Sequence, residues 1–188
     1  MIGATTRFLA RLRGDQSGVS AVEFAFIAPV MILFYFGMVE ACQIMLADRK
    51  TVHAAYAMGD LIAQGGSTIT LTGSGGVNDI LDMGDTLMTP FVTGTNLKIC
   101  VASITADASN VKHVDWSHAT NSATCPAKAS TYNSVPAGLI AANQSVIMST
   151  VSYTYTGSLN MVIQSVPTFV KTSYNRPRKV TTISCPTC

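Results

Sequence analysis

The sequence turns apolar over residues 18–39, and this stretch limits the possible folds more than any other feature. Its strictly uncharged part, residues 24–39, falls just short of the about 17 to 25 residues that a helix needs to cross hydrocarbon. Residues 19–22 make the run long enough. The sequence therefore predicts one membrane-spanning helix, with Glu23 inside the membrane or at its edge.

Basic residues before this run set its expected orientation. The first 17 residues contain three basic residues, Arg7, Arg11 and Arg13, and one acidic residue, Asp15. Positive charge is retained on the cytoplasmic side of a membrane helix. We therefore expect the N-terminus to stay in the cytoplasm and the chain after the helix to be exported.

The composition fits one anchored domain of modest size. Of 188 residues, 48% are hydrophobic and 12% are charged, and this charged share is about half of that in a soluble domain. Beside a membrane helix, this length leaves room for one core and excludes a large multi-domain enzyme. The net charge of +2 is too small to argue for a nucleic-acid partner.

The residues around Glu23 form a pattern with a possible function. In Gly18-Val-Ser-Ala-Val-Glu23-Phe24, a glycine precedes the apolar run and an acid follows five residues later, which resembles a type IV prepilin. Cleavage after Gly18 would give Val19 a positive amine. In a bundle of parallel helices, the carboxylate of one subunit could neutralise the amine of the next in a low dielectric. The alternative is an acid at the interface with its carboxylate in water.

Other export signals fit the sequence less well. A secretory signal needs a small-residue site soon after its apolar core, whereas the nearest such site, residues 55–57, lies far beyond Val39. Residues 39–42 superficially resemble a lipoprotein site. Glu40 beside the cut and Glu23 inside the supposed core argue against both alternatives.

A longer segment carries a family resemblance. Gly18-Val-Ser-Ala-Val-Glu-Phe-Ala-Phe-Ile-Ala-Pro-Val30, followed by Gly37, resembles the start of the TadE/TadG family of the Flp (tight adherence, Tad) pilus system. Less specific pieces are residues 60–64, 114–118, 151–155 and 176–178. Larger TadG-like members add a von Willebrand-type metal-binding domain. This chain has neither that length nor its Asp-x-Ser-x-Ser motif, so TadE-like is the closer label.

The resemblance implies a minor pilin or pseudopilin in the bacterial inner membrane, with one membrane pass and a periplasmic C-terminal domain. A prepilin peptidase would cleave between Gly18 and Val19. Glu23 and Phe24 would then serve assembly with other pilin and pseudopilin subunits at a pilus assembly platform, with possible entry into an extracellular pilus. The large exported part suits a tip, priming or platform role. No cofactor, metal ion, small-molecule substrate or nucleic acid is expected.

The expected fold class is α+β, with a pilin-like exported domain. Residues 1–18 are the leader, residues 19–64 the long helix, residues 65–76 a Gly/Ser-rich connection, and residues 77–188 the exported domain. One stripe of the helix surface should pack on this domain, because apolar and small residues recur along the helix at helical spacing. The stripe comprises Ile44, Thr51, Ala55, Met58 and Ile62.

The exported domain should contain a short helix and an antiparallel sheet. The helix is predicted from residue 77 or 78 to Met88, with its three aspartates (Asp79, Asp82 and Asp85) on the solvated side. Branched and alternating segments predict strands. These are residues 97–105, 111–116, 144–156, 169–174 and 179–183.

Four of the five cysteines lie in the exported part, where disulfides persist. A hairpin turn centred between Ala108 and Ser109 would place Cys100 opposite about Ser117 and let Cys125 fold back to it. The sequence therefore favours a Cys100–Cys125 pair, which leaves Cys185 and Cys188 to each other or to solvent. A Cys100–Cys185 pair remains the alternative.

No pattern indicates an enzyme. His113, Asp115 and His118 resemble a metal-ligand cluster, but in a strand His118 falls on the opposite face from the other two. No nucleophile elbow or phosphate loop occurs. Two non-catalytic alternatives stay open beside the pilus function: an uncleaved single-pass binding protein, and a type II secretion pseudopilin. The fate of Gly18 separates the first of these from a pilin.

Overall fold

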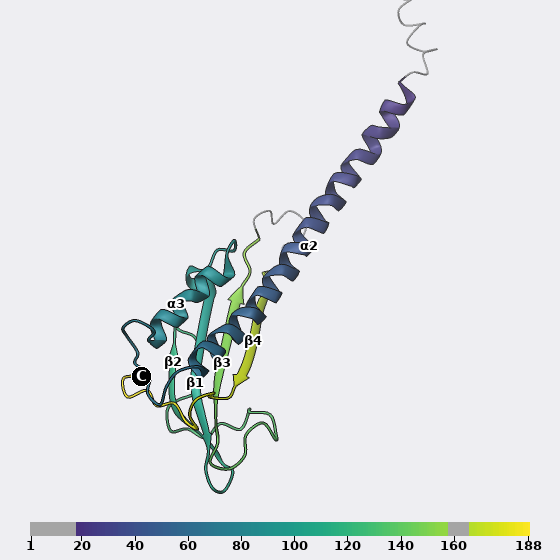
Figure 1. Cartoon of the computed structure of the whole chain (residues 1–188). Coiled ribbons are helices and arrows are strands. Elements are labelled where there is room, and N and C mark those ends of the chain that lie inside the picture. The colour runs from purple at the N-terminus through teal and green to yellow at the C-terminus, as the bar shows by residue number, and fades with distance from the viewer. Residues whose placement is uncertain (1–17, 158–165) are drawn as a thin grey trace, which may run out of the picture. The chain divides into compact units, whose positions relative to one another are not determined.

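The computed structural model describes residues 18–157 and 166–188, which divide into two compact units (Figure 1). The first unit comprises residues 18–42, and the second comprises residues 43–157 with 166–188. The predicted leader lies outside the described residues except for Gly18. The α+β fold class is confirmed, since a long helix is followed by a short helix and a four-stranded antiparallel sheet.

Within residues 18–157, three helical elements precede the sheet. Helix α2 (Val19–Ala63) continues through Pro29 and contributes to both units, and helix α3 (Val77–Met88) follows. A 3₁₀ turn, η1 (Gly94–Asn96), leads into the first strand. Helix α2 ends one residue before the predicted Gln64. Beyond it, the glycine-rich connection contains left-handed residues at Gly73 and Gly75, a conformation that glycine adopts without steric cost.

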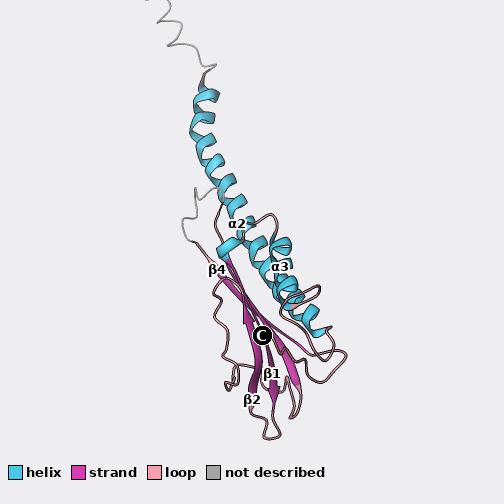
Figure 2. Ribbon diagram, turned by 90° about the vertical axis from the view of Figure 1, so that its left-hand side faces the viewer, coloured by secondary structure: helices cyan, strands magenta, loops and turns pink. Residues whose placement is uncertain are grey.

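The sheet has the strand order β2-β1-β3-β4, with every neighbouring pair antiparallel. Its strands are β1 (Leu97–Ala106), β2 (Lys112–Ala119), β3 (Ser145–Thr154) and β4 (Thr168–Asn175). Figure 2 shows α3 and the C-terminal part of α2 on one face of this sheet. The four strands match four of the five predicted segments to within a few residues.

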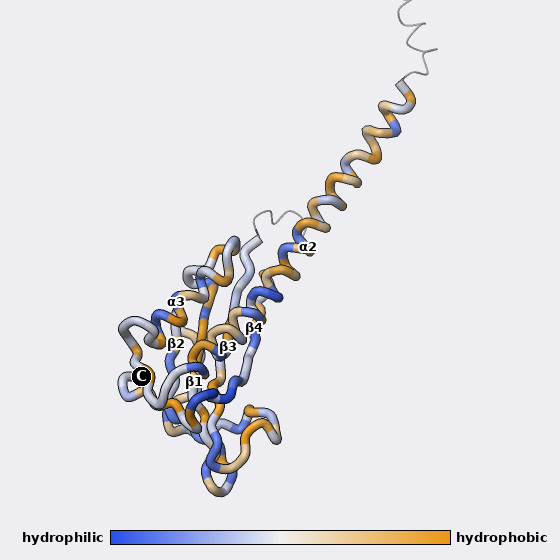
Figure 3. The backbone as a smooth tube through the Cα atoms, viewed as in Figure 1, coloured by the Kyte–Doolittle hydropathy of each residue, from blue (hydrophilic) through white to orange (hydrophobic). Residues whose placement is uncertain are grey.

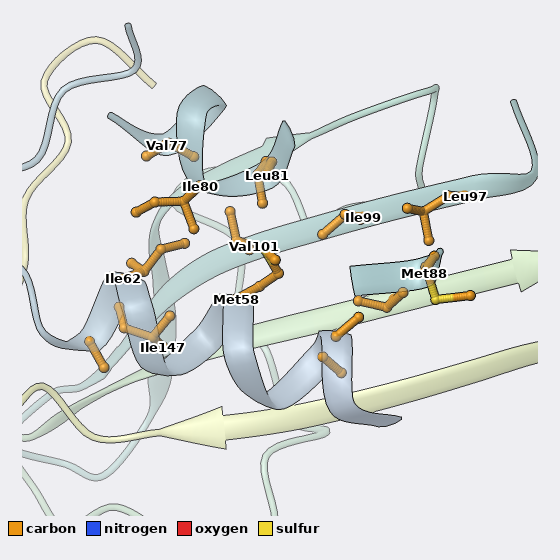
Figure 4. Close-up of a cluster of buried hydrophobic side chains, with 14 of the residues drawn as sticks. Met58, Ile62, Val77, Ile80, Leu81, Met88, Leu97, Ile99, Val101 and Ile147 are labelled. Atoms are coloured by element: carbon orange, nitrogen blue, oxygen red, sulfur yellow. The ribbon is translucent and has the colours of Figure 1, made fainter. Parts of the chain in front are cut away.

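The main core lies between the sheet and the two helices (Figure 4). Met58 and Ile62 of α2 are fully buried against β1, as the predicted stripe requires. Alternate residues of a strand point to the same face. Leu97, Ile99 and Val101 of β1 therefore join this core, whereas the residues between them face away from the helices. The predicted packing of this stripe of α2 on the domain that follows it is confirmed.

A second core covers the opposite face of the sheet. The loop between β2 and β3 places Val135 and Ile140 on Ala102, Ile104 and other alternate residues of the strands. The same loop protects the outer edge of β2, since the amide of Val114 donates to the carbonyl of Ser130. This loop therefore replaces a further layer of secondary structure.

The predicted strand at residues 179–183 is wrong. The backbone carbonyls of this segment accept side-chain hydrogen bonds: Trp116 Nε1 donates to Ile183 O at 2.7 Å and Ser145 Oγ donates to Thr181 O at 2.6 Å. The amide of Arg178 donates to Ala63 O at the end of α2. These bonds fix the segment as an irregular strap across the end of the helix rather than as a strand.

The predicted register of the β1–β2 hairpin is also wrong. Cys100 pairs with Ala119 and not with Ser117. Asp107 Oδ1 accepts the amides of both Ser109 and Val111 at 2.8 Å, which lengthens the turn. A bulge between Ser103 and Ile104 shifts the register further along the strand. Side-chain capping and a bulge together account for the error.

Helix α2 lies close to β3 and β4 at Gly59 and makes polar contacts with β4. A Cβ atom added at Gly59 would lie 2.5 Å from Asn175 Nδ2 and 3.3 Å from Ser149 Cβ. A larger residue at this position would therefore force the Asn175 side chain or the helix to move. Ser173 Oγ donates to Ala55 O at 2.7 Å. Ser149 Oγ is buried, and no described residue gives it a hydrogen-bond partner. The two serines are direct cross-strand neighbours.

These two serines give a matched pair of mutations. We expect Ser149→Ala to leave the free energy of unfolding unchanged or to raise it by up to about 1 kcal/mol, because it removes an unsatisfied buried hydroxyl. Ser173→Ala should lower it by about 1 kcal/mol, because it removes a made bond. Denaturant unfolding followed by Trp116 fluorescence measures both, and equal losses would contradict the assignment.

Candidate functional site

The predicted cleavage residues lie at the start of α2. Val19 is the first helical residue, and the amide of Val22 donates to Gly18 O at 3.1 Å. Gly18 is exposed, and a Cβ atom added to it would meet nothing within 4 Å. The peptide bond between Gly18 and Val19 therefore lies at a boundary between the helix and the residues before it, with no described side chain covering it.

Glu23 and Phe24 follow within the next helical turn. Both are exposed, Phe24 to 70%. Glu23 lies four residues after Val19, so the two share one face of the helix. No described residue forms an ion pair with Glu23. The structure thus brings Gly18, Val19, Glu23 and Phe24 together in the first turns of one helix and leaves the carboxylate uncompensated within the described chain.

The N-terminal half of α2 is mostly apolar along its length (Figure 3). Large apolar side chains around its whole circumference are more than half exposed, including Phe26, Ile27, Val30, Leu33 and Phe34. A helix that is apolar all round and uncovered is typical of a membrane span. Among the described residues, α2 is the one helix that is long and apolar enough to cross a membrane.

The C-terminal half of α2 changes character. From Ala47 onward, small and apolar residues (Ala47, Thr51, Ala54, Ala55, Met58, Ile62 and Ala63) are buried in the second unit. Thr51 Oγ1 donates back to Ala47 O at 2.8 Å, so that its hydroxyl is satisfied within the helix. Lys171 of β4 pairs with Asp48 at 2.7 Å. One face of the helix is thereby fixed on the sheet.

The four cysteines of the second unit lie at disulfide distance in two pairs. Cys100 and Cys125 have Cα atoms 5.5 Å apart, and Cys185 and Cys188 have Cα atoms 5.4 Å apart. The first pair joins β1 to the loop that covers the second core. The second pair closes a tight turn at the C-terminus. The geometry corresponds to the favoured pairing rather than to a Cys100–Cys185 bridge.

The possible metal ligands have separate partners. His113 Nε2 lies 3.4 Å from Asp107, whereas Asp115 accepts hydrogen bonds from Ser103 and Thr105. Partial burial lowers the pKa of His118. In the part of the chain that the structure describes, no three histidine, cysteine or carboxylate side chains form a group that could hold a metal ion. Trp116 is a core residue, only 1% exposed.

One group of residues was missed from the sequence. Tyr155 is 4% exposed, and its hydroxyl donates to Gln43 Oε1 at 3.0 Å, so it joins the end of β3 to α2. The ring of Phe91 lies 5.8 Å from that of Tyr155. The alternation of Tyr153 and Tyr155 indicated their strand, but no sequence pattern indicated that Gln43 would lie beside it.

The comparisons with known proteins point to the same part of the chain. Residues 18–58 match the family model described as TadE-like protein. No curated protein and no solved structure matches the chain. The match begins at Gly18 and does not extend over α3 or the sheet. Together with the apolar half of α2, it supports a membrane-anchored protein associated with a Tad pilus system. Residues 18–58 are thus similar to TadE-like proteins, in agreement with the resemblance seen in the sequence.

Proposed function

We propose that the chain is a minor pilin or pseudopilin of a Tad-type pilus, assembled through α2 after cleavage by a prepilin peptidase. The observation that carries the proposal is the match from Gly18 to Met58 on a helix whose N-terminal half is entirely uncovered. A helix of this kind can pack against lipid before assembly and against other helices after it. The expected partners are the inner membrane, other pilin and pseudopilin subunits, the peptidase and the assembly platform.

The exported unit supports a role other than that of the main filament subunit. It has two cores, one on each face of its sheet, and therefore presents a stable folded surface outside the membrane. The proposal places this unit in the periplasm with the N-terminus in the cytoplasm. It also assigns the unit to initiation, the tip or the assembly platform, where it selects the subunits it meets.

Glu23 gives the proposal its mechanism. After cleavage, the new amine of Val19 and the carboxylate of Glu23 lie on one face of the helix, one turn apart. They can neutralise each other before assembly, which lowers the free-energy cost of a charge in the membrane. In a bundle of parallel helices, the carboxylate can then pair with the amine of a neighbouring subunit, which aligns the two helices along their axes.

We predict that the mature chain begins at Val19. N-terminal analysis or intact mass of membrane-extracted protein measures this directly. Gly18→Val should leave the leader attached, because a side chain would obstruct the peptidase, while the helix tolerates it since nothing lies within 4 Å of that position. An intact Met1 terminus in cells that contain the peptidase would contradict the proposal and favour the uncleaved binding protein.

A further inference from the structure

Two segments of the second unit form an uncharged end. They are residues 89–96, which connect α3 to β1, and residues 166–169, which lead into and begin β4; neither contains a charged residue. Val92 is 71% exposed and Val166 is 56% exposed. Pro90 is also exposed, and Phe91 is half-buried. We refer to these two segments as the uncharged end.

Printed contacts place the uncharged end beside Gln43. The hydroxyl of Tyr155 donates to Gln43 Oε1, and the ring of Phe91 packs edge-on against the ring of Tyr155. The amide of Tyr155 donates to Pro167 O at 2.9 Å, which fixes residues 166–169 at the same place. In Figure 1 the connection from α3 to β1 and the adjoining ends of β3 and β4 lie at one end of the sheet.

Gln43 is also where the chain enters this unit from the apolar half of α2. The uncharged run ends at Val39, four residues earlier on the same helix. At about 1.5 Å per residue, that separation is roughly 6 Å along the helix axis. Chain connectivity alone therefore keeps the uncharged end close to the boundary of the membrane segment.

The opposite end of the sheet has a different surface. Its β1–β2 turn exposes Val111, but Asp107, Lys112 and His113 surround that residue, and Asp107 pairs with His113 at 3.4 Å. Hydrogen bonds from the amides of Val111 and Ser109 keep the pKa of Asp107 low, so Asp107 is charged at neutral pH. Exposed apolar side chains on segments that contain no charged residue are thus found at the end beside Gln43 and not at this turn.

We propose that the uncharged end lies in the lipid–water interface of the membrane that holds α2, with Val92 and Val166 among the lipid headgroups. Lipid is the favoured occupant because the uncharged end lies beside Gln43, four residues after the uncharged run of the chain ends at Val39. The inference rests on the membrane anchoring in the proposed function and adds a second membrane contact.

The test uses tryptophan as a depth probe in the full-length chain. Val92→Trp is reconstituted in phosphatidylcholine vesicles whose acyl chains carry bromine near the headgroup, at a protein density low enough that two copies rarely meet. Apolar surfaces of this kind enter the interface by about 5–10 Å, so we expect emission from the new tryptophan to fall about twofold. The native Trp116 is buried and supplies a constant background.

Two matched variants make the outcomes distinguishable. Val111→Trp, in the charged turn, should be quenched no more than the native chain. Phe34→Trp, in the apolar half of α2, should be strongly quenched because it reports insertion of the helix. Quenching of Phe34→Trp without quenching of Val92→Trp overturns the inference and leaves the proposed function intact. A lack of quenching in Phe34→Trp overturns the membrane anchoring itself.

A second copy of the chain is the competing occupant. In that case the emission of Val92→Trp would shift to the blue as protein density rises, without quenching by the brominated lipids, and the inference would be wrong. Near-ultraviolet circular dichroism of each variant verifies that the fold is retained. Because Val92 is mostly exposed, the larger ring fits without repacking the core.

Discussion

Glu23→Gln should leave the chain cleaved and inserted in the membrane but should remove it from the pilus assembly. The substitution keeps the shape of the side chain and deletes the charge that, in the proposed function, pairs with the amine of Val19. Without that charge, the amine of each subunit remains uncompensated in a low dielectric, which costs a few kcal/mol. Co-isolation of the variant with other pilus components should therefore fall by about tenfold or more.

Glu23→Asp is the matched control for this result. This variant keeps the charge on a side chain that is one methylene shorter. We therefore expect its co-isolation with pilus components to lie between that of Glu23→Gln and that of the unsubstituted chain. Cleavage at Val19 and extraction with the membrane fraction are measured for every variant, which separates assembly from processing. Co-isolation of Glu23→Gln at the level of the unsubstituted chain would refute the pairing role.

The elements with a strong periodic pattern were predictable. Helix α2 combines an uncharged run with a stripe at helical spacing, and both features follow from the sequence alone. Strand β3 alternates small polar and larger residues over Val151, Ser152 and Tyr153, which is typical of a half-buried strand. In such segments the local pattern and the tertiary contacts favour the same structure, so the prediction held.

The errors arise where side chains compete with backbone pairing. Residues 179–183 have the branched composition of a strand, yet Trp116 and Ser145 bind their carbonyls from other parts of the chain. The shifted register of Cys100 comes from Asp107, whose carboxylate caps the turn. Such bonds join residues far apart in sequence or depend on side-chain geometry, and no periodicity records them.

For the candidate site, the sequence was informative about residue types but not about surroundings. The sequence alone shows that Glu23 lies five residues after Gly18. The structure adds that no described side chain forms an ion pair with its carboxylate. By contrast, the uncharged end becomes visible only once Tyr155 is seen beside Gln43. Long-range contacts of this kind join residues more than 100 positions apart, and no sequence pattern records them.

Of the two cysteine pairs, Cys100–Cys125 should contribute more to the stability of the second unit. It joins residues 25 apart in sequence and fastens the loop that covers the second core. Closing a loop of this length stabilises a fold by about 3 kcal/mol, chiefly by restricting the unfolded chain. The double variant Cys100→Ala, Cys125→Ala should therefore lose about that much free energy of unfolding, measured by Trp116 fluorescence in denaturant.

The second cysteine pair supplies an internal comparison for this effect. Cys185 and Cys188 are only three residues apart, so their bridge restricts the unfolded chain much less, and Cys185→Ala, Cys188→Ala should cost less stability. Equal losses for the two double variants would contradict the loop argument. Peptide mapping without reduction tests the pairing itself. A peptide that links Cys100 to Cys185 would contradict it. In that case the covalent bond would join the sheet to the C-terminal segment, and packing alone would hold the loop over the second core.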